Sequence, residues 1–402
     1  MKKMIFLALF LFMQGSRCAD ETATVWPNRF DCDALLTSAM AQYTKAVNSL
    51  TDTTRMPIHN KADGTWVQKS TSDWVSGFFP GILWYFYDYS GEQQWLQSAR
   101  KWNAALEQEK FNTSSHDVGF MLYCSFGNGY RLTGDEAYKA ILLQGAESLI
   151  TRFNSNVGAI KSWDSAPENH LTIIDNMMNL ELLCWASQAS GDPKFRDIAI
   201  RHSDVTLANH FRPDFSSYHV LNYNPQTGAV MEKKTHQGYS DESMWARGQA
   251  WGGYGYTMMY RFTRDRRYLA IAQKTFDRFI QRLPADFIPY WDFDAPNIPH
   301  EPREASAAAI AASGLLELST YADSTGLKNR YYQTAVNLLK ALSTSDYLAT
   351  SGKYQCLLLH SNGSVPGQAD IDVNVAYADY YYVEALLRLK KLLEGKPLFQ
   401  PS

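Results

Sequence analysis

The sequence of 402 residues lacks the segments that usually separate domains in a long chain. It contains no proline- or serine-rich linker, no block of like charge and no low-complexity tract. With 45% hydrophobic and 14% aromatic residues, the chain can build a large core. Length alone would suggest two or three domains, but because no boundary signal is present we predict one domain over residues 19–402.

Cysteine is scarce and is not spaced for metal binding. The five cysteines include no CxxC pair and have no histidine at ligand spacing, which argues against a zinc site. Cys124 and Cys184 lie in apolar runs and are expected to be small core residues. A disulfide between other cysteines stays open. We predict neither a metal nor a cofactor.

Several catalytic motifs are also missing. The sequence has no HExxH, no GxSxG and no phosphate-binding Gly-Lys-Ser/Thr loop. The formal net charge is −3, so the chain lacks the basic excess that favours a nucleic-acid partner. Carboxylates are plentiful, and with those motifs absent the simplest catalytic machinery is a pair of carboxyl groups acting without a metal.

A targeting signal is predicted at the N-terminus. Two lysines precede the apolar run Met4–Met13, and small residues follow it. That run is too short to span a bilayer, so residues 1–18 are predicted to be a secretory signal peptide of a periplasmic or secreted protein. Lipid anchoring through Cys18 is the less favoured alternative, because Arg17 fits that signal poorly. No later segment is predicted to cross a membrane.

A degenerate repeat runs through the rest of the chain. Each copy has a small residue, then polar residues, then an aromatic four or five places on, then an alanine-rich stretch. The copies lie at 89–99, 132–142, 189–199, 262–272 and, more loosely, 323–335. This pattern is typical of the turn in a helix–turn–helix hairpin.

The turn residues explain the pattern. Glycine suits the left-handed position that closes a helix, and aspartate suits the cap of the next helix, with proline favoured directly after it. The expected left-handed glycines are Gly91, Gly134, Gly191 and Gly326, with Arg264 in the fourth copy, and the expected caps are Asp135 and Asp192, followed by Pro193.

The two helices of each hairpin differ in character. The first is apolar or small on all sides, as in 305–321, whereas the second is amphipathic, as in 93–110. The first helices therefore form an inner ring and the second an outer ring. Helices over about 32–50 and 373–393 would pair to complete six hairpins. We predict an all-α fold, an (α/α)6 barrel, with an open helical-repeat scaffold as the alternative.

Polar and aromatic residues precede the inner helices, and in a closed ring these helix starts meet at one mouth. A single aspartate there can be an ordinary helix cap, but the combination of carboxylates, aromatics and an arginine indicates a sugar site. The residues at these starts are Trp74, His116, Asp117, Asp175, Asn176, Trp245, Arg247, Gln249, Trp251, Arg303, Glu304, Asp370 and Asp372. Arg247 needs an acidic partner or ligand if it is buried.

At these positions the sequence resembles glycoside hydrolase family 88, the unsaturated glucuronyl hydrolases. The motifs that carry the resemblance are WVSGFFPGILWYFY at 74–87, HDVGF at 116–120, IIDNMMNLELL at 173–183, YHVLNYNPQTG at 218–228, THQGYSDESMWARGQAWGGYGY at 235–256, ASAAAIAASGLLEL at 305–318 and DVNVAYADYYYVEALLRL at 372–389. The resemblance implies an (α/α)6 barrel. It also implies removal of a terminal unsaturated uronic acid from lyase-generated, glycosaminoglycan-type oligosaccharides, by hydration of the C4=C5 bond.

The resemblance assigns roles to individual residues. Asp175 matches the catalytic acid/base and Asp117 a second essential carboxylate, for which we favour a positioning role over that of nucleophile. Two close carboxylates would raise one pKa, whereas the helix starts favour the anion, and the sequence leaves the outcome open. Substrate contacts are predicted for Trp74, His116, His219, Lys233, Thr235, Gln237, Trp245, Arg247, Trp251, Ser361 and Ser364.

One departure from the family pattern stands out. The fifth inner helix opens with Arg303-Glu304-Ala305-Ser306, where relatives are expected to carry Asp-Ser/Thr-Ser. Glu304 is longer than aspartate, which puts the substrate preference at this part of the mouth in doubt.

Other functions stay open. An unsaturated rhamnogalacturonyl hydrolase would share the fold and act on pectin fragments, but the HDVGF carboxylate favours the glucuronyl enzyme. A sugar epimerase would use histidines rather than aspartates. A non-catalytic glycan-binding protein is the alternative outside enzymes. The aglycone sugar and the oligomeric state, monomer or dimer, are not predicted.

Overall fold

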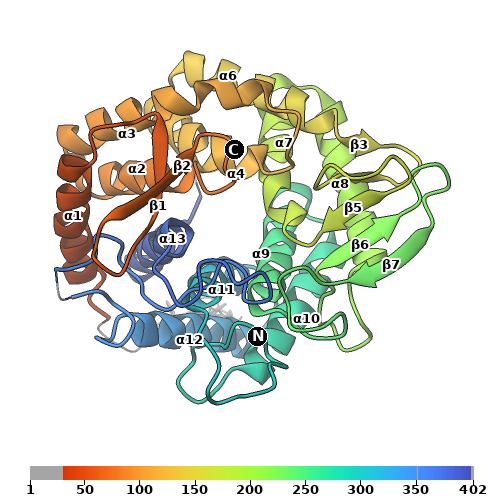
Figure 1. The fold of residues 1–402 in the computed structure, drawn as a ribbon. Helices are drawn as coiled ribbons and strands as arrows, with labels where there is room; N and C mark the ends of the chain where they lie inside the picture. Colours follow the sequence, from red (N-terminus) through yellow and green to blue (C-terminus); the bar gives the residue numbers. More distant parts are fainter. Residues whose placement is uncertain (1–29, 351, 400–402) are drawn as a thin grey trace, which may run out of the picture.

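Six helical hairpins close into a double ring in the computed structural model, which describes residues 30–350 and 352–399 (Figure 1). The predicted signal peptide and Cys18 lie outside the described residues. Five of the inner helices are α2 (Phe78–Ser90), α7 (Asn176–Ser190), α9 (Ala246–Thr263), α11 (Ala305–Ser319) and α13 (Ala376–Leu393). The sixth consists of three consecutive segments, α4 (Val118–Leu122), η2 (Tyr123–Gly127) and α5 (Asn128–Thr133). The outer helices are α3 (Gln93–Leu106), α6 (Glu136–Ile150), α8 (Pro193–Asn209), α10 (Arg266–Arg282), α12 (Thr325–Leu342) and α1 (Cys32–Ser49).

The two ends of the chain close the ring as predicted. Helix α13 packs against α11 on one side and α2 on the other, and α1 covers it from outside. The hydroxyl of Tyr43 on α1 donates to Asp379 on α13 over 2.7 Å. The prediction of an (α/α)6 barrel rather than an open scaffold is therefore confirmed.

The inner and outer helices bury their side chains as their sequences predict. All residues of α11 are buried, and α9 is buried over Ala246–Met259, so neither helix has a solvent face. Helix α10 instead buries one stripe that includes Tyr268 and Phe279. One hydrophobic cluster runs from Cys32 to Leu389 through both rings.

Most predicted turns take the expected backbone. Gly91, Gly134 and Gly191 end their helices with φ of 69°, 66° and 76°. Arg264 takes the same left-handed conformation, with φ of 58°, although it has a side chain. The left-handed turn of the repeat is therefore kept in the fourth copy, where arginine stands in place of glycine.

The predicted caps are confirmed, but one glycine was misplaced. Asp135 and Asp192 accept hydrogen bonds from backbone N–H groups in the first turns of α6 and α8. Gly326, by contrast, lies inside the first turn of α12, and the prediction that it closes a helix is wrong. Ser324 caps α12, and α11 ends at Ser319 with Thr320 as a C-cap in the right-handed conformation.

Short strands, which the sequence did not predict, fill the loops before the inner helices. Strands β1 (Arg55–Asn60) and β2 (Trp66–Ser70) form an antiparallel hairpin, as do β3 (Phe153–Asn154) and β4 (Ala159–Ile160). Strands β5 (His170–Ile173), β6 (Val220–Tyr223) and β7 (Val230–Lys234) form an antiparallel sheet in that order. A short helix, η1 (Glu107–Phe111), follows α3.

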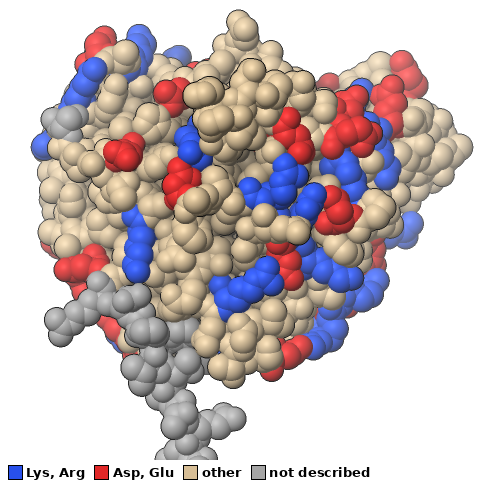
Figure 2. Space-filling model, turned by 90° about the horizontal axis from the view of Figure 1, so that it is seen from below, with Lys and Arg blue, Asp and Glu red and all other residues tan. Residues whose placement is uncertain are grey.

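The four cysteines of the described ranges are all buried and unpaired, and Cys124 and Cys184 lie in the core as predicted. Within these ranges no helix has both the length and the apolarity needed to cross a bilayer. On the face shown in Figure 2, lysines and arginines are interspersed with acidic residues and form no field of one sign.

Candidate active site

Two aspartates stand at the starts of neighbouring inner helices and do not cap them. Asp117 directly precedes α4 and Asp175 directly precedes α7, yet neither carboxylate accepts a hydrogen bond from its helix. Asp135 and Asp192 occupy the same position on outer helices and do accept one. The carboxylates of Asp117 and Asp175 are therefore available for another task.

A glycine brings these two helices together. A Cβ atom on Gly119 would lie 2.6 Å from Oδ1 of Asn179 and 2.7 Å from its Cα, so no larger residue fits between α4 and α7. Oδ1 of Asn179 accepts from the backbone N–H of Phe120 over 2.7 Å, and its Nδ2 donates to Asp117 over 3.4 Å. Asn179 thus fixes Asp117 relative to the helix that carries Asp175.

Asp117 is held from its other side by its neighbours in the chain. The hydroxyl of Ser115 donates to Oδ2 over 3.1 Å, and Nε2 of His116 lies 3.2 Å from Oδ1. Nδ1 of His116 lies 3.0 Å from the carbonyl oxygen of Ser162, which places its proton on that nitrogen. Burial lowers the pKa of His116, so the ring is largely neutral and its Nε2 faces Asp117 without donating a hydrogen bond to it.

Burial decides the protonation of Asp175. Its side chain is 13% exposed, and burial raises its pKa to about 7. The positive charge of Arg247 opposes this increase, and the negative charge of Asp117 adds to it. Burial and the charge of Asp117 thus outweigh the effects that favour the anion, so that Asp175 titrates near neutral pH and is protonated below it.

His219 points a proton at Asp175. Its Nδ1 accepts from the backbone N–H groups of His236 and Gln237, over 3.1 and 3.2 Å, so the ring proton must lie on Nε2. Nε2 lies 3.8 Å from Oδ2 of Asp175. Burial lowers the pKa of His219 well below its usual value, which keeps the ring neutral and makes it a fixed donor.

The sequence matches known proteins along nearly all of its length. The profile described as Glycosyl Hydrolase Family 88 matches residues 45–386. An unsaturated glucuronyl hydrolase of Formosa agariphila is 40% identical over 98% of this chain and all of its own length. An unsaturated chondroitin disaccharide hydrolase of Streptococcus agalactiae is 32% identical over 80% of this chain and 82% of its own.

A crystal structure of an unsaturated glucuronyl hydrolase specific for heparin superimposes with a TM-score of 0.87 and 43% identity, over 90% of this chain and 98% of that one. The chain belongs to glycoside hydrolase family 88. It is thus a hydrolase, and the resemblance seen in its motifs is confirmed.

Three of the residues predicted to contact substrate line one cavity of this family 88 enzyme. Trp74, Gln237 and Ser364 border a space of 170 Å³ together with Tyr377 and Asp370. The ring of Trp74 lies 4.9 Å from that of Tyr377, which provides an aromatic wall. Trp245 stands nearby, with its ring 4.4 Å from that of His219.

The remaining predicted contacts lie deeper in the enzyme or further out. Trp251 and Ser361 are fully buried, and the Ser361 hydroxyl accepts from the backbone N–H of Ser306. Lys233 donates to the carbonyl of Asn209 over 2.7 Å, and its ammonium lies 4.9 Å from the ring of Tyr218, two residues before β6. Thr235 accepts from the backbone of Gly238 and holds a turn. Substrate contacts of these residues stay predictions.

Sequence reasoning missed Trp163, whose ring lies 5.1 Å from that of His236 and 6.2 Å from that of His219. Trp163 lies in the loop between β4 and β5. The site was predicted from residues at the starts of inner helices, and Trp163 is not one of them. Asn179 and Tyr377 were missed because each lies in the first turn of an inner helix, among residues that the sequence pattern assigned to the core.

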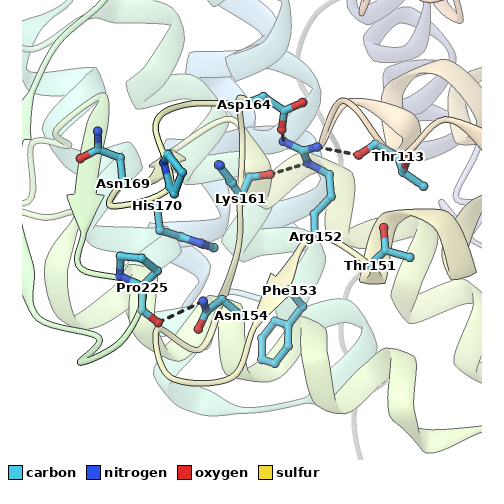
Figure 3. A pocket seen from close by; sticks show the side chains of 11 residues that line it. Thr113, Thr151, Arg152, Phe153, Asn154, Lys161, Asp164, Asn169, His170 and Pro225 are labelled. Atoms are coloured by element: carbon cyan, nitrogen blue, oxygen red, sulfur yellow. Dashed lines mark hydrogen bonds and ion pairs between the residues drawn. The ribbon is translucent and has the colours of Figure 1, made fainter.

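A second, larger cavity of the family 88 enzyme has neither of the two aspartates in its lining. It measures 430 Å³ and is bordered by Arg152, Lys161 and Asn154 among others (Figure 3). The guanidinium of Arg152 is occupied by Asp164 and by the carbonyls of Thr113 and Lys161, as the dashed lines in Figure 3 show. Among the described residues, no three His, Cys, Asp or Glu side chains gather as metal ligands.

Proposed function

We propose that this family 88 enzyme removes the terminal Δ4,5-unsaturated uronic acid from lyase-generated glycosaminoglycan oligosaccharides by hydrating its double bond. The observation that carries the proposal is the state of Asp175. A carboxyl group that keeps its proton up to about pH 7, next to a second carboxylate at the mouth of the barrel, can act as a general acid.

The chemistry follows from the positions of the two groups. The carboxyl group of Asp175 gives its proton to C4, and a water molecule adds its hydroxyl to C5. The remaining proton of that water returns to the Asp175 carboxylate, which restores the acid. The product is a hemiketal at C5, which opens to a ketone and leaves a hemiacetal at C1. The hemiacetal then collapses to an aldehyde and releases the remaining sugar.

Asp117 positions substrate and water in this scheme and needs no covalent bond to the sugar. Both of its oxygens accept a hydrogen bond, Oδ2 from Ser115 and Oδ1 from Asn179. A carboxylate fixed in this way suits orientation by hydrogen bonding better than displacement at a carbon atom.

Relatives named for heparin and for chondroitin fragments support a glycosaminoglycan substrate. The test is to mix the protein with unsaturated disaccharides from heparin, chondroitin and hyaluronan lyase digests, and to follow the ultraviolet absorbance of the double bond. Asp175→Asn should lose at least about a hundredfold in rate, because the proton donor is removed. Asp135→Asn is the matched control and should keep wild-type activity, since asparagine also caps a helix.

The ranking of the three disaccharides identifies the preferred aglycone. If none of them reacts, pectin-derived fragments test the rhamnogalacturonyl alternative. If a folded sample acts on none of these substrates, the proposed function is wrong and a glycan-binding role takes its place.

We also propose that residues 1–18 are a signal peptide and that the enzyme acts in the periplasm or outside the cell. Two lysines followed by the apolar run Met4–Met13 support this location. Mass spectrometry of the exported protein tests it. A mature chain starting shortly after Cys18 supports cleavage, whereas a lipid-modified Cys18 supports the anchored alternative, and an unprocessed chain refutes both.

A further inference from the structure

Glu304 places a buried negative charge at the start of α11. Its side chain is fully buried, and it does not cap the helix. The Ser306 hydroxyl and the Asn362 amide both donate to its carboxylate, the latter over 3.2 Å. NH1 of Arg247 lies 3.4 Å from Oε2. Burial raises the pKa of Glu304, but each of these neighbours is a donor and Arg247 is a cation, so the surroundings favour the ionised carboxylate paired with Arg247.

Arg247 is itself enclosed. NH1 and NH2 donate to the carbonyls of Asn362 and Gly363, over 2.6 and 2.9 Å. The rings of Trp245 and Tyr377 lie 4.5 and 5.4 Å from the centre of its guanidinium. Only 1% of the residue is exposed, so its terminal nitrogens serve the turn at 361–363.

We propose that Glu304 is a positioning residue, which holds Arg247 against the turn at 361–363 and balances the charge of its guanidinium beside Asp175. This inference rests on the proposed hydrolase function. It assigns a purpose to the residue at which this chain departs from the expected family pattern.

The turn at 361–363 matters because Gly363 borders the 170 Å³ cavity, which three residues predicted to contact substrate also line. The Gln237 side chain donates to the same Gly363 carbonyl over 2.8 Å, and Gly363 and Ser364 line the 170 Å³ space beside Trp74. A shift of Asn362 would therefore move one wall of this cavity. The length of the residue 304 side chain sets where that wall stands.

The charge of Glu304 matters because of what surrounds Asp175. Asp117 acts on it from the start of α4, His219 faces it from the position directly before β6, and Arg247 acts on it from α9. Of these, only Arg247 lowers the pKa of Asp175 by its positive charge. If Glu304 became neutral, that charge would be unbalanced, and the pKa of Asp175 would fall further.

The test compares Glu304→Gln, which removes the charge at nearly constant shape, with Glu304→Asp, which keeps the charge and shortens the side chain. In Glu304→Gln the alkaline limb of kcat/KM should move to lower pH by roughly one unit. In Glu304→Asp that limb should stay at the wild-type pH, while KM rises about three- to tenfold because the turn loses its support. A limb that does not move in Glu304→Gln, or one that moves equally in both variants, overturns the proposal.

Two controls keep the outcome clear. Wild-type enzyme measured alongside must turn over the substrate, so an inactive wild type refutes the function and not this inference. If circular dichroism shows that Glu304→Gln is unfolded, Arg247→Met is compared with the double variant Glu304→Gln/Arg247→Met. The single variant should move the limb to higher pH and the second substitution should move it back. Identical limbs in these two variants contradict the proposal.

Discussion

Nε2 of His219 lies 3.8 Å from Oδ2 of Asp175, and neither atom has a hydrogen-bond partner within the described part of the chain. The distance is too long for a hydrogen bond, so a donor and an acid face each other across a gap. The backbone of His236 and Gln237 fixes the orientation of the donor. We interpret this gap as the place where the water that adds to C5 meets Asp175.

Two substitutions of His219 separate its functions. Asparagine places an oxygen near the position of Nδ1 and can keep accepting from residues 236 and 237, but it has no donor at the position of Nε2. His219→Asn should therefore lower kcat by roughly ten- to a hundredfold with little change in the melting temperature. Glutamine reaches the position of Nε2 but leaves the two backbone donors without an acceptor, so His219→Gln should lower the melting temperature more. Equal effects of the two variants on both quantities would contradict this division.

The activity should fall as pH rises through neutrality. Asp175 acts as an acid, its pKa is raised to about 7 by burial, and its protonated fraction decreases above that value. The alkaline limb of kcat/KM should therefore centre near pH 7. Initial rates across the neutral range check this, with the melting temperature measured at each pH as a control for folding. A rate that stays constant well above neutrality would exclude Asp175 as the acid.

The acid of the active site should cost stability. Because the folded pKa of Asp175 lies above the ordinary value of 3.8, the native state binds this proton more tightly than the unfolded state. The resulting stabilisation is present at acidic pH and is lost as pH rises to about 7. Asp175→Asn, which cannot ionise, should thus be more stable than wild type at neutral pH by about 1–4 kcal/mol. Urea unfolding should show this gain closing at acidic pH, while Asp135→Asn shows no such gain.

Local signals made the ring predictable. Arg264 illustrates how strong they are, since its position in the repeat predicted a helix end that the residue type disfavours, and its φ is 58°. Gly326 illustrates their limit, because a glycine after a helix closes it only when the chain reverses at that residue. In this turn Ser324 starts the next helix first. The Ser324 hydroxyl accepts from the backbone N–H of Leu327, and this local cap places Gly326 inside the helix.

The site was harder to predict than the ring. Asp117 and Asp175 were singled out because they precede inner helices, and the structure brings those helix starts together. Trp163 and the strands β5–β7 lie in loops whose course depends on contacts distant in sequence, such as the bond from His116 to the carbonyl of Ser162. The pKa of Asp175 depends chiefly on burial. The sequence did not show how deeply this residue is buried, so it could not decide between the helix effect, which favours the anion, and the nearby carboxylate, which favours the protonated form.

Closure of the ring should depend on Asp379. Its carboxylate is fully buried and accepts from the backbone of Leu357 and Leu358 over 2.7 and 2.9 Å, and from Tyr43 over 2.7 Å. Asp379→Asn places an amide donor among donors, which should lower the free energy of unfolding by about 1–3 kcal/mol. Tyr43→Phe removes only one donor and should cost less, about 1 kcal/mol. Both variants should keep the wild-type KM, because these bonds join α1, α13 and the 357–358 segment and are not part of the mouth. Urea unfolding followed by fluorescence gives the free energies. If Tyr43→Phe cost as much as Asp379→Asn, the bond to α1 rather than the two backbone bonds would hold the ring closed.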